Sequence, residues 1–323
     1  MKKEENMFYE YEFENENGYE KGSAEYYKDL CLETDISLRY DTQRIFEEKY
    51  TIATKNKDYA LLRNVFYHEI KLQKMPFWEG GVDHSHGFRT MLNIIACDDF
   101  QNVYKIFPEG LPLASNGYSM YVKATNIVLC MLYNKDGKEV YDKGKIIEQA
   151  KKYIDSKQPV WDRAVLACVL AIMEHDVTTF SENIQKVCEG YSKQDIIKYR
   201  KLQCDPAYGL VVFAKHFWSK KEFEKIKYPE YKNFDKGYID WLLGLDTFPN
   251  DLCFEYEGTY EEMNDILKLP IIQTYIHQPY LGTDNPYISA KSKKDWYVDV
   301  KGKMRDEFCA QIKRYFEENV EDR

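Results

Sequence analysis

The stretch WDRAVLACVLAIMEHD, residues 161–176, is the most hydrophobic segment of the chain and decides its fold class. Pro159 precedes it, and proline is favoured where a helix begins. The apolar residues cover nearly every side of the helix that this pattern predicts, so we expect the helix to be central and buried. Asp176 follows as the N-cap of a second helix, which ends near Gly190.

The same order of signals occurs once more, earlier in the chain. An apolar segment at 93–97 leads to Asp98 or Asp99 as an N-cap, and the helix that follows closes at Gly110. Adjacent helical hairpins that bury each other's apolar faces are typical of solenoids. The sequence therefore predicts an all-α fold with an irregular, solenoid-like array of helical hairpins. Periodicity and cap residues predict further helices at about 23–55, 58–76, 116–131, 140–154, 208–218, 238–245, 260–269 and 303–319.

Three regions differ in composition. Residues 1–22 hold seven glutamates against three lysines and predict a poorly ordered acidic N-terminal arm, although alternating aromatics would also suit a short strand. Residues 23–226 carry the helical-hairpin pattern. Prolines interrupt residues 227–323, which we interpret as a less regular C-terminal helical subdomain or cap.

Composition excludes several classes of protein. The chain has 323 residues, and 54 Asp and Glu against 45 Lys and Arg give a formal charge of −9. Such a field repels phosphate backbones and anionic membranes, so we expect no nucleic-acid or membrane partner. Residues 1–5 lack an apolar signal core, and the longest apolar run, 164–173, is about half a membrane span, which predicts a cytoplasmic protein.

The eight cysteines are spread singly, without a C-x-x-C pair. This spacing fits neither a disulfide framework nor a zinc knuckle. We therefore expect buried, reduced thiols.

The densest group of metal-ligating residue types is Asp83-His84-Ser85-His86. Imidazole and carboxylate groups bind zinc, but two histidines at i and i+2 supply at most half a site, and no second histidine-rich segment completes it. Capping of the following helix by Asp83 or Ser85 explains the residues more simply. We predict no metal, while a metal-dependent hydrolase using Asp83, His84 and His86 remains the alternative.

His175-Asp176 is an HD dipeptide, as found in metal-dependent phosphohydrolases, but further ligands at suitable spacing are missing. An N-cap role for Asp176 beside a helix-terminal histidine accounts for the pair. No nucleophile elbow, Walker A loop or dinucleotide fingerprint is present in the chain. We therefore predict a protein that is not an enzyme, without catalytic residues and without a cofactor.

One segment favours recognition of a partner. Residues 255–265 gather five carboxylates and two tyrosines without a basic residue. Acidic residues mixed with aromatics suit an interface to a basic protein, although a solvated helix start at Glu261 and Glu262 would explain the same pattern. The predicted partner-binding residues are Glu255, Tyr256, Glu257, Tyr260, Glu261 and Glu262.

The helix from WDRA at 161–164 to MEHD at 173–176, continuing to Phe180 and then to YGL at 208–210, is similar to the all-α immunity-49 family of bacterial polymorphic toxin systems. The similarity spans about residues 88–220, and the helical immunity proteins of nuclease toxins are an equally suitable relative. The resemblance implies an immunity protein that binds and neutralises a cognate, basic toxin. A helical-repeat scaffold or regulator is the other alternative.

Overall fold

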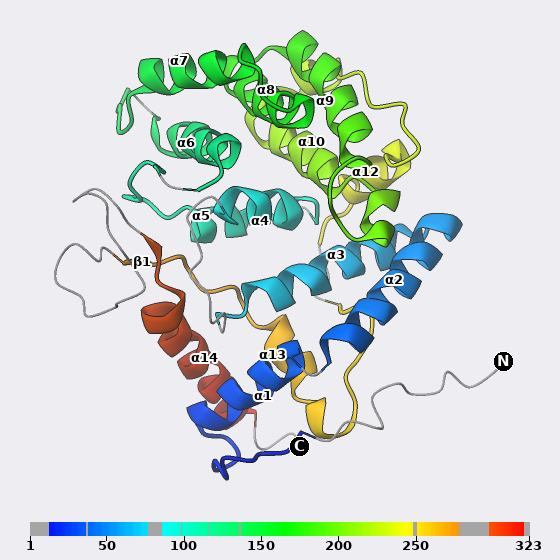
Figure 1. Ribbon diagram of the computed structural model, residues 1–323, viewed down its shortest axis with the longest axis vertical. Helices are drawn as coiled ribbons and strands as arrows, with labels where there is room; N and C mark the ends of the chain where they lie inside the picture. The colour runs from blue at the N-terminus through cyan, green and yellow to red at the C-terminus, as the bar shows by residue number, and fades with distance from the viewer. Residues whose placement is uncertain are drawn as a thin grey trace. The chain divides into compact units, whose positions relative to one another are not determined.

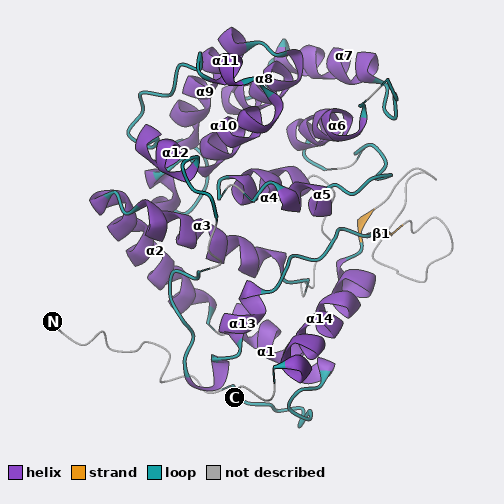
Figure 2. Cartoon of the chain, turned by 180° about the vertical axis from the view of Figure 1, so that it is seen from behind, coloured by secondary structure: helices purple, strands orange, loops and turns teal. Residues whose placement is uncertain are grey.

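The computed structural model describes residues 13–36, 38–76, 86–97, 99–115, 117–135, 137–247, 251–277 and 297–319. These residues form fourteen α-helices, so the predicted all-α class is confirmed (Figures 1 and 2). A two-residue antiparallel pair, Ile276–His277 (β1) with Tyr297–Val298 (β2), is the one strand pairing in this described part. The chain divides into two compact units. We call residues 82–248 and 276–298 the central unit, and residues 1–81, 249–275 and 299–323 the terminal unit.

The central unit is built around α8, Val160–Glu174. All residues from Ala164 to Met173 are buried, as the apolar pattern predicts. Helices α6, α7, α9 and α10 pack against α8, so that it has no solvated face along this stretch (Figure 1). The other elements of this unit are α4 (His86–Ile95), α5 (Gln101–Ile106), α6 (Ser119–Tyr133), α7 (Lys143–Ile154), α9 (Val177–Tyr191), a 3-10 turn (Lys198–Leu202), α10 (Asp205–Phe217), α11 (Lys220–Phe223) and α12 (Lys236–Leu242).

The turn between α8 and α9 follows the predicted hairpin. His175 adopts the left-handed conformation (φ 56°) that ends α8, and the Asp176 carboxylate accepts a hydrogen bond of 2.9 Å from the Thr179 amide. Asp176 is thus an N-cap, as predicted, and the His175 ring lies 3.1 Å from a Glu222 carboxylate oxygen.

The solenoid-like array is not confirmed. In a solenoid each repeat contacts only its neighbours in sequence. Here α4 packs against α10, more than a hundred residues further along the chain, and α8 contacts helices on several sides. Gly209 of α10 allows the first of these contacts, because a Cβ at this position would lie 2.3 Å from the Leu92 carbonyl oxygen of α4.

Gly209→Ala should therefore destabilise the protein by about 2 kcal/mol or more, since backbone atoms of two packed helices would have to move apart. Gly144→Ala in α7 is the matched control, because its added Cβ would meet nothing closer than 3.6 Å and alanine favours a helix. Urea unfolding of both variants measures the difference. Equal midpoints would show that the close approach of α4 and α10 is not required.

The terminal unit is assembled from three separate segments of the chain. Tyr27 of α1 stacks on Phe316 of α14 with ring centroids 4.8 Å apart, and the Lys71 ammonium of α3 donates a hydrogen bond to the Leu269 carbonyl. Its elements are α1 (Ala24–Ile36), α2 (Arg39–Asn56), α3 (Tyr59–Lys74), a 3-10 turn (Gly258–Tyr260), α13 (Met263–Lys268), a π-helical turn (Val300–Met304) and α14 (Arg305–Glu318).

This division differs from the predicted domains. The boundary expected near residue 226 falls inside the central unit, and the predicted subdomain 227–323 is shared between both units. Residues 1–12 of the predicted acidic arm lie outside the described residues. Residues 13–22, expected to be poorly ordered, follow turns at Asn15–Gly18 and Glu20–Ser23, and Phe13 contacts Tyr26 and Tyr260. These contacts are non-local, so composition could not reveal them.

Most local predictions are confirmed, but the helix expected at 23–55 is divided into α1 and α2, and the caps of α5 and α6 differ from those expected, the cap of α6 being Tyr118. Asp58 caps α3 through its side chain, as its position before the predicted helix indicates, and all eight cysteines are free and buried. Asp142 caps α7 in the same way, although the sequence did not single it out as a cap. Helix α5 has Phe100 at its N-cap position, and no side chain caps it by a hydrogen bond. The prediction that Asp99 is the N-cap of this helix is therefore wrong. Asp98 and Asn116, another expected cap, lie outside the described residues. No helix in the described ranges combines the length and apolarity needed to cross a bilayer.

Candidate functional site

The predicted partner-binding residues lie in the terminal unit, on the segment that leads through the 3-10 turn into α13. Tyr256 and Tyr260 are each 1% exposed and belong to the hydrophobic core. Glu262 is 9% exposed, whereas Glu255 and Glu261 are exposed and Glu257 is half-buried.

The two tyrosines therefore cannot anchor a partner, which corrects their predicted role. The side-chain amide of Asn264 accepts a hydrogen bond from the Tyr256 backbone N–H and donates one to the Tyr256 backbone carbonyl, each at 2.8 Å. These two bonds hold the segment against α13. With the backbone fixed in this way, Tyr256 faces the core. The two tyrosines of this segment therefore stabilise the fold. Its exposed carboxylates are the groups that a partner could contact.

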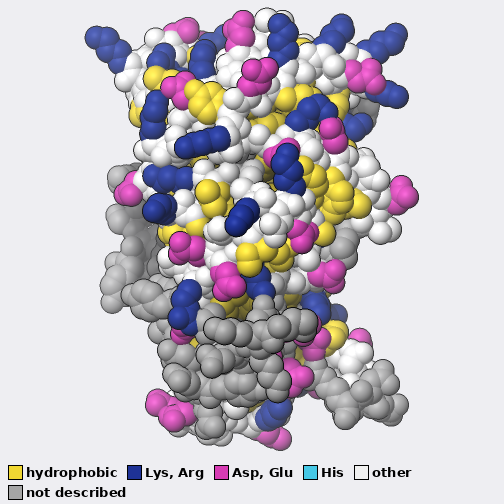
Figure 3. Space-filling model, turned by 90° about the vertical axis from the view of Figure 1, so that its right-hand side faces the viewer, with side chains coloured by type: hydrophobic (Ala, Val, Ile, Leu, Met, Phe, Trp, Pro, Cys, Tyr) yellow, Lys and Arg dark blue, Asp and Glu magenta, His cyan; other side chains and the backbone are white. Residues whose placement is uncertain are grey.

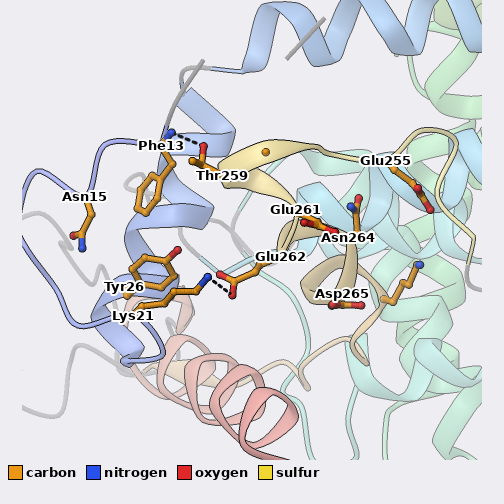
Figure 4. A pocket seen from close by; sticks show the side chains of 12 residues that line it. Phe13, Asn15, Lys21, Tyr26, Glu255, Thr259, Glu261, Glu262, Asn264 and Asp265 are labelled. Atoms are coloured by element: carbon orange, nitrogen blue, oxygen red, sulfur yellow. Dashed lines mark hydrogen bonds and ion pairs between the residues drawn. The ribbon is translucent and has the colours of Figure 1, made fainter. Parts of the chain in front are cut away.

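These carboxylates line a hollow of about 640 Å³, which we call the acidic hollow (Figure 4). Its two cationic side chains are Lys21 and Lys268. Four carboxylates against two ammonium groups leave an excess of negative charge around this hollow. The four carboxylates are Glu255, Glu261, Glu262 and Asp265.

Glu262 carries the most constrained charge of the acidic hollow. Its carboxylate pairs with the Lys21 ammonium at 3.2 Å (Figure 4). Burial, together with the charge and hydrogen bond of Glu262, raises the pKa of Tyr26 to about 12. The phenol therefore stays protonated at neutral pH and remains a hydrogen-bond donor to this carboxylate.

A wall of the acidic hollow comes from the segment expected to be a disordered arm. The Phe13 amide donates to the Thr259 hydroxyl at 2.7 Å, and the Phe13 ring meets Tyr26 edge-on with centroids 5.5 Å apart (Figure 4). Sequence analysis missed Phe13 and Lys21 as members of the site. The only sequence signal was the alternation of aromatic residues up to Phe13.

The described residues contain no group of three or more His, Cys, Asp and Glu side chains arranged to hold a metal ion. Asp83, His84 and Ser85 lie outside the described residues, and His86 is described only as the first residue of α4. The hydrolase alternative therefore gains no geometric support from the described residues.

A cysteine–histidine pair does occur in the terminal unit, at residues that the sequence did not single out. The Cys253 Sγ lies 3.5 Å from His68 Nδ1, with Phe46 and Phe254 around the imidazole. Burial lowers the pKa of His68 to about 3 and raises the pKa of the Cys253 thiol. Both groups are neutral, so the pair lacks the thiolate and imidazolium that a nucleophilic site uses.

Comparisons of the chain with protein-family models, with curated proteins and with solved structures find no match. Inferences about function therefore depend on the residues and their geometry.

The buried His68 predicts acid sensitivity. Its pKa is about 3 in the folded protein and about 6.5 in an unfolded chain, so the unfolded state binds more protons between these values. Stability should fall as pH drops through this window, with about 3 kcal/mol lost to this residue by pH 4.5.

The test is urea unfolding of wild type and His68→Phe at pH 7.5 and pH 4.5. Phenylalanine keeps an aromatic ring in this aromatic environment but has no proton to bind. For each protein, the unfolding free energy at pH 4.5 is compared with its own value at pH 7.5. The decrease should be smaller for the variant than for wild type. An identical loss in both proteins would assign the acid sensitivity to other groups.

Proposed function

We propose that this chain is a binding protein that receives a basic segment of a partner protein in the acidic hollow. The observation that carries the proposal is the excess of carboxylates there, with Glu255 and Glu261 exposed to an approaching cation. Lysine or arginine side chains would meet an excess of negative charge there, which attracts and orients a cationic segment.

The charge distribution along the chain supports the choice of the terminal unit. Its residues include 30 Asp and Glu against 19 Lys and Arg, a formal charge of −11. The central unit has 24 against 26, a formal charge of +2, and Figure 3 shows Lys and Arg side chains spread over its visible face. The net negative charge therefore resides in the terminal unit. An acidic surface increases the association rate of a basic partner and specifies its orientation.

The biological role that we propose is neutralisation of a bacterial toxin, as the resemblance to immunity proteins suggests. An all-α fold with a locally concentrated negative charge is compatible with blocking a basic toxin sterically and electrostatically. This mechanism needs no catalytic residue and no cofactor. The partner would be recognised by its positive charge and by its fit to the acidic hollow.

The first test is affinity capture of the full chain from its native cells at low and moderate salt, followed by expression of the captured partner. We expect one basic protein that inhibits growth when expressed alone and is harmless when co-expressed with this chain. A partner that is not toxic, or whose toxicity persists on co-expression, would contradict the immunity role.

The second test locates the binding surface. Glu255→Lys combined with Glu261→Lys should slow association with the captured partner by about tenfold at low salt, because electrostatic attraction is lost. Glu109→Lys with Glu224→Lys is the matched control: it makes the same change in charge on exposed residues of the central unit. Equal association rates for the two double variants, measured by surface plasmon resonance, would remove the acidic hollow from the interface.

A further inference from the structure

The central unit contains a second hollow, of about 260 Å³, where residues of α4, α8 and α10 meet. Helix α4 contributes Arg89 and Asn93, which lie four residues apart and hence on one face of the helix. Trp161 comes from α8 and Asp205 from the start of α10. We call this space the central hollow. It is distinct from the acidic hollow in residues and in charge, and it plays no part in the proposed function.

Asn93 is the residue of the central hollow that most clearly points to a ligand. It is 7% exposed and lines the hollow, yet its side-chain amide has no hydrogen-bond partner among the described residues. An amide offers both donors and an acceptor, so a small polar molecule could be bound from either end.

The charges around the central hollow are balanced. Arg89 is exposed and forms no ion pair within the described ranges, so its guanidinium is available to a carboxylate. Asp195 and Asp205 supply negative charge, and the Tyr191 hydroxyl donates a hydrogen bond to Asp205. Two guanidinium groups and two carboxylates in one small space suit a ligand that carries both signs of charge. The second guanidinium belongs to Arg200.

Tyr121 of α6 also lines the central hollow, and these charges affect the pKa of its phenol. Burial raises its pKa, Arg89 opposes that effect, and Asp162 and Asp205 reinforce it. Arg89 and Asp205 therefore both act on the same phenol. Both side chains line the central hollow, so one bound molecule can meet both signs of charge there.

The walls of the central hollow are held by tight packing. A Cβ at Gly190 of α9 would lie 2.9 Å from Cδ1 of the Trp161 ring, and Gly209 brings α10 against Leu92 of α4. Close contacts on two sides leave these elements little room to move. A preformed polar site of this kind loses less entropy on binding than a mobile one.

Volume limits the size of the ligand. A hollow of about 260 Å³ lies just below the range of about 300–1,000 Å³ that is usual for drug-sized ligands, so it suits a small molecule. We propose that the central hollow binds a free α-amino acid, with the carboxylate on Arg89, the ammonium group towards Asp195 and Asp205, and Asn93 bonded to either group.

The experiment is isothermal titration calorimetry of the full chain with each of the twenty L-amino acids at up to 10 mM. We expect at least one to bind. Its α-amide, which lacks the carboxylate, and its N-acetyl form, which lacks the ammonium group, should each bind at least tenfold more weakly. No binding by any amino acid would overturn the proposal, as would a derivative that binds as tightly as the parent amino acid.

Two variants connect the binding to these residues. Arg89→Met should weaken binding of the same amino acid at least tenfold, whereas Lys138→Met, which removes an exposed cation of the same unit outside the hollow, should leave it unchanged. Because Arg89 is exposed, its variant should unfold at the same urea concentration as wild type. Equal affinity of both variants would overturn the assignment. The Glu255→Lys, Glu261→Lys protein should retain full binding, which separates this inference from the proposed function.

Discussion

The central unit depends on the burial of α8. An apolar helix with no solvated side must be covered all round, because each exposed face would leave hydrophobic surface in water. Helices α6, α7, α9 and α10 provide this cover, and the turn at His175 and Asp176 returns the chain directly into one of them. The central hollow lies at the edge of this arrangement, where Trp161 and Val165 of α8 reach the crossing of α4 and α10.

In the terminal unit, a single short segment serves both folding and surface chemistry. Tyr256 and Tyr260 are buried in the core, while Glu255 before them and Glu261 after them face water. Burying tyrosine gains hydrophobic free energy, whereas burying an unpaired carboxylate costs far more than it gains. Glu262 shows the compromise, because it is buried while its charge is paired with the exposed Lys21 ammonium and hydrogen-bonded by Tyr26.

The two hollows offer different chemistry. The acidic hollow has an excess of negative charge and suits lysine or arginine side chains, which approach through long-range attraction. The central hollow has balanced charges and a buried amide, and it selects by local hydrogen bonds and shape. One chain can therefore hold a protein-binding surface and a small-molecule site in separate units.

The sequence by itself determined the helices and their ends. The apolar run of 161–173 predicts α8, and Asp58 and Asp176 act as the caps that their positions indicate, because such signals operate within a few residues. Tertiary structure decided the rest. Only packing between distant segments places Phe13 against Tyr260, turns Tyr256 inward, and brings Arg89 to Asp205, because side-chain burial depends on neighbours far along the chain. The periodicity of a short segment such as 255–262 cannot specify which of its faces the rest of the protein will cover.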